Sequence, residues 1–163
     1  MKTSVKAAVR PGSRAKAQPS GAGPRKEHFT YGAWTKGKFS EVVTVTGPGT
    51  LIFLAGVGSE DENDGAIRHK GDFLGQCRYA FDKIERLLAR HGATLGDIVK
   101  MVTYVTDIRC LPEYNKFRRE LFGKRPLPAH TFLNIMQLAW PGMAVEIDVI
   151  AAVPERPARR ASR

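Results

Sequence analysis

Two carboxylates, Glu146 and Asp148, stand in an otherwise apolar run, AVEIDVIAAV, over residues 144–153. Successive side chains of a β-strand point to opposite faces, so the two acids share one face with Ile150 while the other face is wholly apolar. A buried carboxylate is costly unless it is paired or hydrogen-bonded. The acids therefore mark either the solvated end of a sheet or a working pocket.

A second polar residue, His130, lies in the alternating segment AHTFLNI, residues 129–135. The connection from this segment to the acidic strand is short and carries the turn signal Pro141-Gly142. The spacing predicts two adjacent antiparallel strands, which would bring His130 close to Glu146.

The elements that must position these residues follow from hydrophobic periodicity. Residues 39–47 and 50–56 flank Pro48-Gly49 and predict a β-hairpin, whose second strand, TLIFLAG, is apolar throughout and so is expected to be buried on both faces. Apolar residues that recur at steps of three and four predict helices. The full series of elements is β-β-α-β-α-β-β, which predicts an α+β domain with a mixed sheet and two helices on one face. The remaining elements are helices over 72–90 and 112–122 and strands over 98–106, 129–135 and 144–153.

The strand over residues 98–106 is apolar on both faces. One side carries Val99, Met101 and Val105, and the other carries Ile98, Val102 and Tyr104. Two helices cover only one face of the sheet, so something else must cover the second. Another copy of the same chain is the most economical solution, which predicts a homo-oligomer.

The formal net charge of +10 lies mostly at the two ends of the chain. Residues 1–28 hold seven Lys or Arg and one acid, residues 154–163 hold four Arg and one acid, and residues 29–153 carry a net charge of +1. The N-terminal segment is rich in Ala, Ser, Gly and Pro, which is typical of a disordered basic tail, and 154–163 is expected to be a second basic tail. One domain, 29–153, remains between them. Basic tails give only weak, salt-sensitive contacts with nucleic acid, so nucleic acid is not the expected partner.

The chain shows no secretory signal and no membrane-spanning run. Cys77 and Cys110 show no pairing pattern, which favours a cytoplasmic location. Cys77 is expected in the core, and Cys110, just before a helix, is expected to be an ordinary thiol. The histidines and cysteines lack paired ligand spacing, so the sequence predicts neither a metal site nor a cofactor.

Several of these motifs together resemble the reactive intermediate deaminase family (Rid, or YjgF-type). They are Pro-Ala-x-Thr at residues 128–131, VEIDVIA at 145–151, DIVKMVTYVTD at 97–107, LIFLAG at 51–56 and Asn115 in LPEYNKF. The resemblance implies a YjgF-like (chorismate-mutase-like) fold, a homotrimer around a three-fold axis, and pockets between subunits. It also implies hydrolysis of reactive enamines and imines to keto acids and ammonia.

The site that the resemblance implies departs from the family pattern. In the family, an Arg of Pro-Ala-Arg-Ser/Thr binds the substrate carboxylate, a Glu of the final strand orients or activates water, and an Asn shapes the site. Glu146 and Asn115 match, but His130 stands in place of the Arg, and a neutral imidazole is a weaker anchor than a guanidinium. The expected catalytic set is therefore Glu146, His130 and Asn115.

The residues at the substrate-binding positions that the resemblance implies also differ from those usual in the family. Ala55, before Gly56, replaces a usual Ser or Thr, Val57 replaces a usual Gln, and Trp34 stands where a tyrosine is expected. These changes argue against the standard amino-acrylate substrate.

Three functions remain open at this point. The first is a divergent enamine or imine deaminase acting on a small molecule. The second is a trimer that binds a small metabolite or a protein partner between subunits without turnover. The third, nucleic-acid engagement through the tails, is disfavoured by the near-neutral domain. Under any of these, His130 could also be a purely structural strand residue, bonded to Glu146 or a carbonyl.

Overall fold

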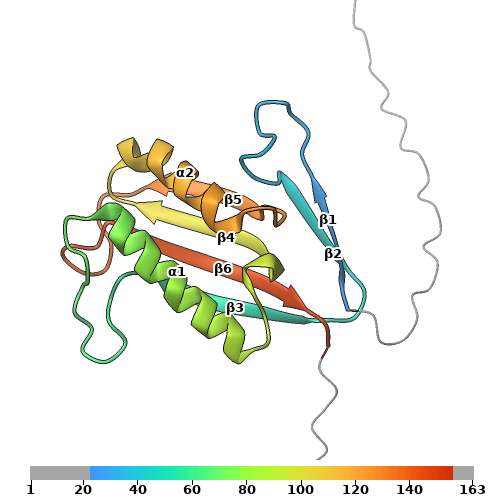
Figure 1. Ribbon diagram of the computed structural model, residues 1–163, viewed down its shortest axis with the longest axis horizontal. Coiled ribbons are helices and arrows are strands. Elements are labelled where there is room, and N and C mark those ends of the chain that lie inside the picture. The colour runs from blue at the N-terminus through green and yellow to red at the C-terminus, as the bar shows by residue number, and fades with distance from the viewer. Residues whose placement is uncertain (1–22, 156–163) are drawn as a thin grey trace, which may run out of the picture.

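The computed structural model describes residues 23–155 and contains a two-stranded ribbon, a four-stranded sheet and two helices (Figure 1). The elements in chain order are β1 (Arg25–Phe29), β2 (Val42–Thr46), β3 (Thr50–Val57), α1 (Phe73–Arg90), a 3₁₀ turn (Leu95–Asp97), β4 (Ile98–Val105), a second 3₁₀ turn (Ile108–Cys110), α2 (Leu111–Phe122), β5 (Ala129–Asn134) and β6 (Val145–Val153).

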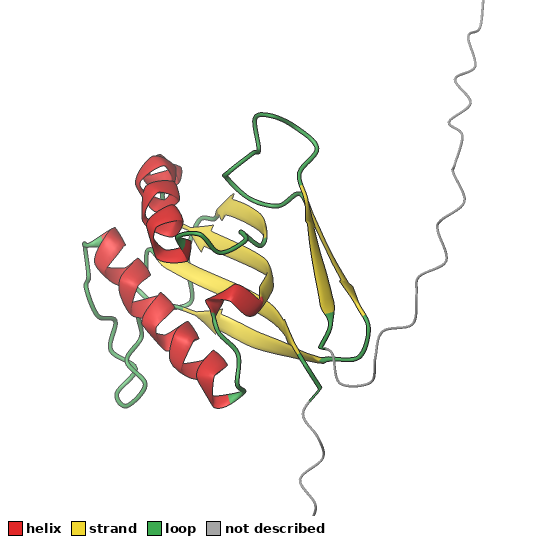
Figure 2. Cartoon of the chain, turned by 45° about the vertical axis from the view of Figure 1, so that its right-hand side comes forward, coloured by secondary structure: helices red, strands yellow, loops and turns green. Residues whose placement is uncertain are grey.

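The four-stranded sheet has the order β3-β6-β4-β5. The alternating strand β6 lies inside the sheet and pairs antiparallel with both β3 and β4, whereas β5 pairs parallel with β4. Parallel neighbours require a crossover connection, and α2 provides it. Both helices lie on the same side of this sheet (Figure 2). The predicted α+β class, mixed sheet and one-sided helical layer are therefore confirmed.

Local sequence signals set the ends of both helices. Asp72 caps α1 by accepting a hydrogen bond from the Gly75 backbone N–H at 2.9 Å, and the helix ends at His91-Gly92, where Gly92 has φ of 69°. Pro112 lies in the first turn of α2, and Gly123, with φ of 57°, follows its end.

The core fills the space between the helices and the sheet. Phe81 of α1 packs against Phe117 and Phe122 of α2, with ring centroids 5.8 and 6.4 Å apart. Cys77 is fully buried here, as predicted. The other buried members are Ala80, Ile84, Leu88, Met101, Val105, Tyr114, Val145, Ile147, Val149 and Ala151.

The predicted hairpin between residues 39–47 and 50–56 is wrong. β2 pairs instead with a strand that the sequence did not reveal, β1, while β3 pairs with β6. β1 is a charged segment, RKEHF, and a two-stranded ribbon needs no continuous apolar run. Tertiary pairing therefore outweighed the local turn signal Pro48-Gly49.

The predicted boundary of the N-terminal tail at residue 28 is also corrected, because β1 begins at Arg25. Lys26 Nζ of this strand lies 2.8 Å from Asp97 Oδ1, and His28 Nδ1 lies 3.0 Å from Ser40 Oγ. These contacts join the strand to the domain. The expectations for residues 1–22 and 156–163 lie outside the described residues.

The second face of the sheet is open in the single chain. Leu51 and Phe53 of β3 are 51% and 68% exposed, and Leu133 of β5 is 44% exposed. β3 is therefore buried on one face only, and its predicted two-sided burial is wrong for the isolated chain. We call this surface, which also carries Tyr104, Glu146 and Asp148, the open face.

No helix within residues 23–155 is long and apolar enough to cross a membrane.

Candidate functional site

Glu146 lies on the open face, where a hollow of about 320 Å³ gathers polar side chains from β4, β6 and the β5–β6 connection. The lining residues are Tyr104, Ile135, Gln137, Leu138, Ala139, Glu146 and Asp148. The Tyr104 hydroxyl donates to Asp148 Oδ2 at 3.2 Å, which holds one carboxylate in place. The two acids that the strand pattern placed on one face thus line a common cavity.

Gly56 makes room for the Glu146 side chain, since any Cβ at this position would collide with the carboxylate. The structure therefore brings together two of the residues singled out in the sequence. A glycine at this point of β3 lets a carboxylate lie flat across the neighbouring strand.

The environment of Glu146 raises its pKa above the ordinary value of a glutamic acid. Partial burial is the main cause, and the negative charges of Asp148 and Glu60 add to it. A carboxyl group whose pKa moves toward neutrality can both accept and return a proton, which is what a general acid–base group must do.

His130 does not join Glu146, so the predicted proximity of these two residues is wrong for the single chain. Their strands are not adjacent, because β4 lies between β5 and β6. His130 is in register with Met101, whereas Glu146 is in register with Tyr104, an odd number of residues away on the same strand. Since side chains alternate between faces, His130 points to the helix face and Glu146 to the open face.

His130 forms part of a polar chain beneath α2. Its Nε2 lies 3.0 Å from Thr103 Oγ1, which lies 2.7 Å from the Tyr114 hydroxyl. Burial lowers the pKa of His130 to about 3, with help from the positive charges of Arg118 and Lys100. The imidazole is therefore neutral at physiological pH, and it interacts with this hydroxyl network rather than with a carboxylate.

The other predicted site residues are spread over the molecule. Asn115 is half-buried on α2, on the helix side of the sheet, and Ala55 is exposed on β3 beside Gly56. Val57 belongs to the core at 4% exposure and does not reach the open face. Trp34 is 72% exposed in the loop between β1 and β2, where Lys38 Nζ lies 3.9 Å from its ring centre.

Neither cysteine is a nucleophile in this environment. Burial raises the pKa of Cys77 far above its usual range and that of Cys110 to about 11. The Cys110 thiol donates to the Asp107 carbonyl oxygen at 2.7 Å. Both sulfurs are protonated at neutral pH, in agreement with the predicted core and ordinary roles.

Sequence reasoning missed two groups. Tyr104 was assigned only to an apolar face, yet its hydroxyl contacts Asp148. Arg118 is buried against the β1–β2 loop, although it carries a charge. Its position four residues after the inward-facing Tyr114 was a usable signal, since residues four apart on a helix share a face.

Comparison with known proteins agrees with this architecture. Residues 33–153 match the family model described as Endoribonuclease L-PSP. The Rid-family protein YyfB of Yersinia pestis has the same fold, with a TM-score of 0.70 at 22% identity over 80% of this chain and 98% of that one.

Relatives in sequence carry related names. The RutC family protein YjgH of Escherichia coli strain K12 is 36% identical over 115 residues, covering 66% of this chain and 79% of the relative. The 2-iminobutanoate/2-iminopropanoate deaminase of Dermatophagoides farinae is 24% identical over 118 residues, covering 72% and 87%. The fold defines an α+β protein of the YjgF type, and the chain belongs to the Endoribonuclease L-PSP (YjgF/Rid) family.

Proposed function

We propose that this protein is a hydrolytic deaminase of reactive imines or enamines, with Glu146 as its acid–base group. The observation that carries this proposal is the half-buried Glu146, whose pKa is raised, in a cavity shared with Tyr104 and Asp148. Family membership and a relative named as an imino-acid deaminase support the same reaction class.

The proposed reaction needs one group that handles protons twice. The Glu146 carboxylate takes a proton from water while the water oxygen attacks the carbon of a protonated C=N bond. Glu146 then returns that proton to the nitrogen of the resulting carbinolamine and the C–N bond breaks. As the C=O bond forms, the hydroxyl proton passes through Glu146 to the departing ammonia, so that a ketone or aldehyde and ammonium leave. General acid–base assistance of this kind contributes about 10²–10⁴-fold in rate.

The negative charge of the Glu146 cavity favours some imine substrates over others. Glu146 and Asp148 line it, and Glu60 adds a further negative charge nearby. A 2-imino acid would bring its carboxylate into this negative field, whereas a protonated imine without a carboxylate is attracted to it. We therefore propose substrates without a carboxylate beside the reacting carbon.

We further propose that copies of this chain cover the open face and enclose the cavity, as a homotrimer. Phe53, Leu51 and Leu133 expose large apolar side chains on that face, and exposed apolar patches mark interfaces. The homotrimer itself is an expectation from the family resemblance.

Ammonia release in the presence of freshly generated imines tests the activity. A flavin amine oxidase acting on benzylamine supplies an imine without a carboxylate, and an amino-acid oxidase acting on alanine supplies 2-iminopropionate. We expect the protein to accelerate ammonia release from the first at least tenfold more than from the second. Glu146→Gln should abolish this acceleration, while Glu85→Gln, on the exposed side of α1, should not.

Equal acceleration by wild type and Glu146→Gln would refute the assignment of Glu146. No acceleration of either imine would leave the non-catalytic binding protein as the better description.

A further inference from the structure

Arg118 of α2 is a buried cation without a counter-ion. Its side chain is 1% exposed, and its Nη2 donates to the Lys38 carbonyl oxygen in the β1–β2 loop. Its Nε and Nη1 have no acceptor within residues 23–155. A buried guanidinium in this state is strongly unfavourable unless an anion compensates it.

Two more arginines without ion pairs lie at the same end of α2. Arg119 follows on α2, and Arg125 lies in the turn after α2, where its Nη1 donates only to the carbonyl oxygens of Leu121 and Phe122 at 3.3 Å. In the described part of the chain none of these three arginines has a carboxylate partner. Six other basic side chains there each contact an acid: Arg25, Lys26, Arg68, Lys83, Arg86 and Arg109.

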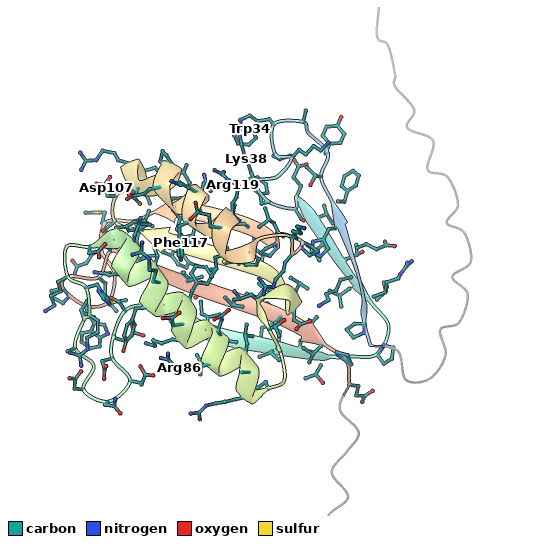
Figure 3. The ribbon with its side chains drawn as sticks, in the orientation of Figure 1. Trp34, Lys38, Arg86, Asp107, Phe117 and Arg119 are labelled. Atoms are coloured by element: carbon teal, nitrogen blue, oxygen red, sulfur yellow. The ribbon has the colours of Figure 1, made fainter. Side chains whose placement is uncertain are left out.

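A cavity of about 340 Å³ opens at this point, between the end of α2 and the β1–β2 loop. Arg119 and Arg125 lie on one wall, and Gly37, Phe39 and Ser40 lie on the other. Figure 3 labels Arg119 on α2 and Lys38 in the β1–β2 loop, the two elements that bound this cavity. Arg118 does not itself line the cavity, but it contacts the carbonyl of Lys38, and the neighbours of Lys38 in the loop, Gly37 and Phe39, both line it.

We propose that this cavity is a binding site for a small carboxylate, which takes Arg118 as its principal partner and Arg119 and Arg125 as supporting charges. The carboxylate replaces the Lys38 carbonyl as the acceptor for the Arg118 N–H groups. A charge-assisted contact is stronger than the neutral one that it replaces. Gly37, with φ of 73°, gives the loop a residue that can change its backbone conformation without steric cost.

The surroundings favour a monoanion with a short apolar body. Phe39 and Leu127 contribute apolar surface to the cavity, and Arg118 is the only one of the three arginines that is removed from solvent. A dianionic phosphate would lose more hydration on entering than one buried guanidinium returns. The site is also separate from the Glu146 cavity, since the four-stranded sheet lies between α2 and the open face.

Isothermal titration of the full-length protein with propionate tests the proposal. Propionamide, which has the same shape without the charge, and inorganic phosphate are the comparison ligands. We expect propionate to bind at least tenfold more tightly than either. Equal binding of phosphate would refute the preference for a carboxylate, and equal binding of propionamide would refute a charge-based site.

Arg118→Met is the decisive variant, because methionine fills the same space without charge. We expect it to weaken propionate binding about tenfold to a hundredfold while leaving the melting temperature equal to or above that of wild type, because removing an unpaired buried charge is not destabilising. If Arg118 serves only to hold the loop through Lys38, the variant should instead melt lower and bind propionate normally.

Two controls make the outcome specific. Arg90→Met applies the same change at the exposed end of α1 and should bind propionate like wild type. Glu146→Gln should also bind propionate like wild type. A negative result in the deaminase assay would therefore not count against this site. Wild-type protein that binds no propionate would refute the site whatever the assay shows.

Discussion

The two faces of the four-stranded sheet carry similar apolar side chains but meet different surroundings. On the helix face, Met101 of β4 and Ile147 of β6 are fully buried, whereas on the open face Phe53 and Leu133 remain exposed. The polar groups follow the same division: the carboxylates of Glu146 and Asp148 gather on the open face, and the positive charge of Arg118 lies under the helices. The sheet therefore separates an acidic cavity from a basic one. It also separates His130 from Glu146, so these two residues cannot share a site within one chain.

The largest effect should come from the core that lies between the helices and the helix face of the sheet. Phe81→Ala removes a fully buried ring that contacts Phe117 and Phe122, and should lower the free energy of unfolding by about 3–5 kcal/mol. Urea denaturation followed by circular dichroism measures this loss. A loss below 1 kcal/mol would mean that the two faces do not differ in packing as described.

A charge added to the helix face should be nearly as harmful. His130→Arg places a second guanidinium beside Arg118, and should lower the free energy of unfolding by about 3 kcal/mol, because an uncompensated charge is then buried. The neutral His130→Gln is the matched control and should lose less. Adding Arg118→Met to His130→Arg should recover most of the loss, and thermal unfolding of the single and double variants decides whether it does.

The smallest effect on folding should come from the open face. Phe53→Ala removes a ring that is 68% exposed, so the free energy of unfolding of a single chain should change by less than about 0.5 kcal/mol. Its effect should appear in assembly: light scattering of wild type should give about three times 18.0 kDa, and the variant should dissociate at higher protein concentration. A wild-type protein that is monomeric at micromolar concentration would contradict the proposal that copies of the chain cover the open face.

The sequence alone determined the elements whose signals are local. The 3.6-residue period of α1, its Asp72 cap and its stop at Gly92 all depend on neighbours within a few residues, and so they could be predicted. The alternation of β6 likewise showed that Glu146 and Asp148 share a face, and the family motifs indicated the fold.

Only the tertiary structure decided which elements meet. A period of two shows which side chains of a strand lie together, but not which side of the sheet they face or which strand lies next to it. The sequence therefore could not show that β4 separates His130 from Glu146, or that RKEHF pairs with β2. Arg118 is the clearest case: its spacing from Tyr114 indicated the inward face of α2, but its partner, the Lys38 carbonyl, lies eighty residues earlier in the chain, and no local pattern indicates that contact.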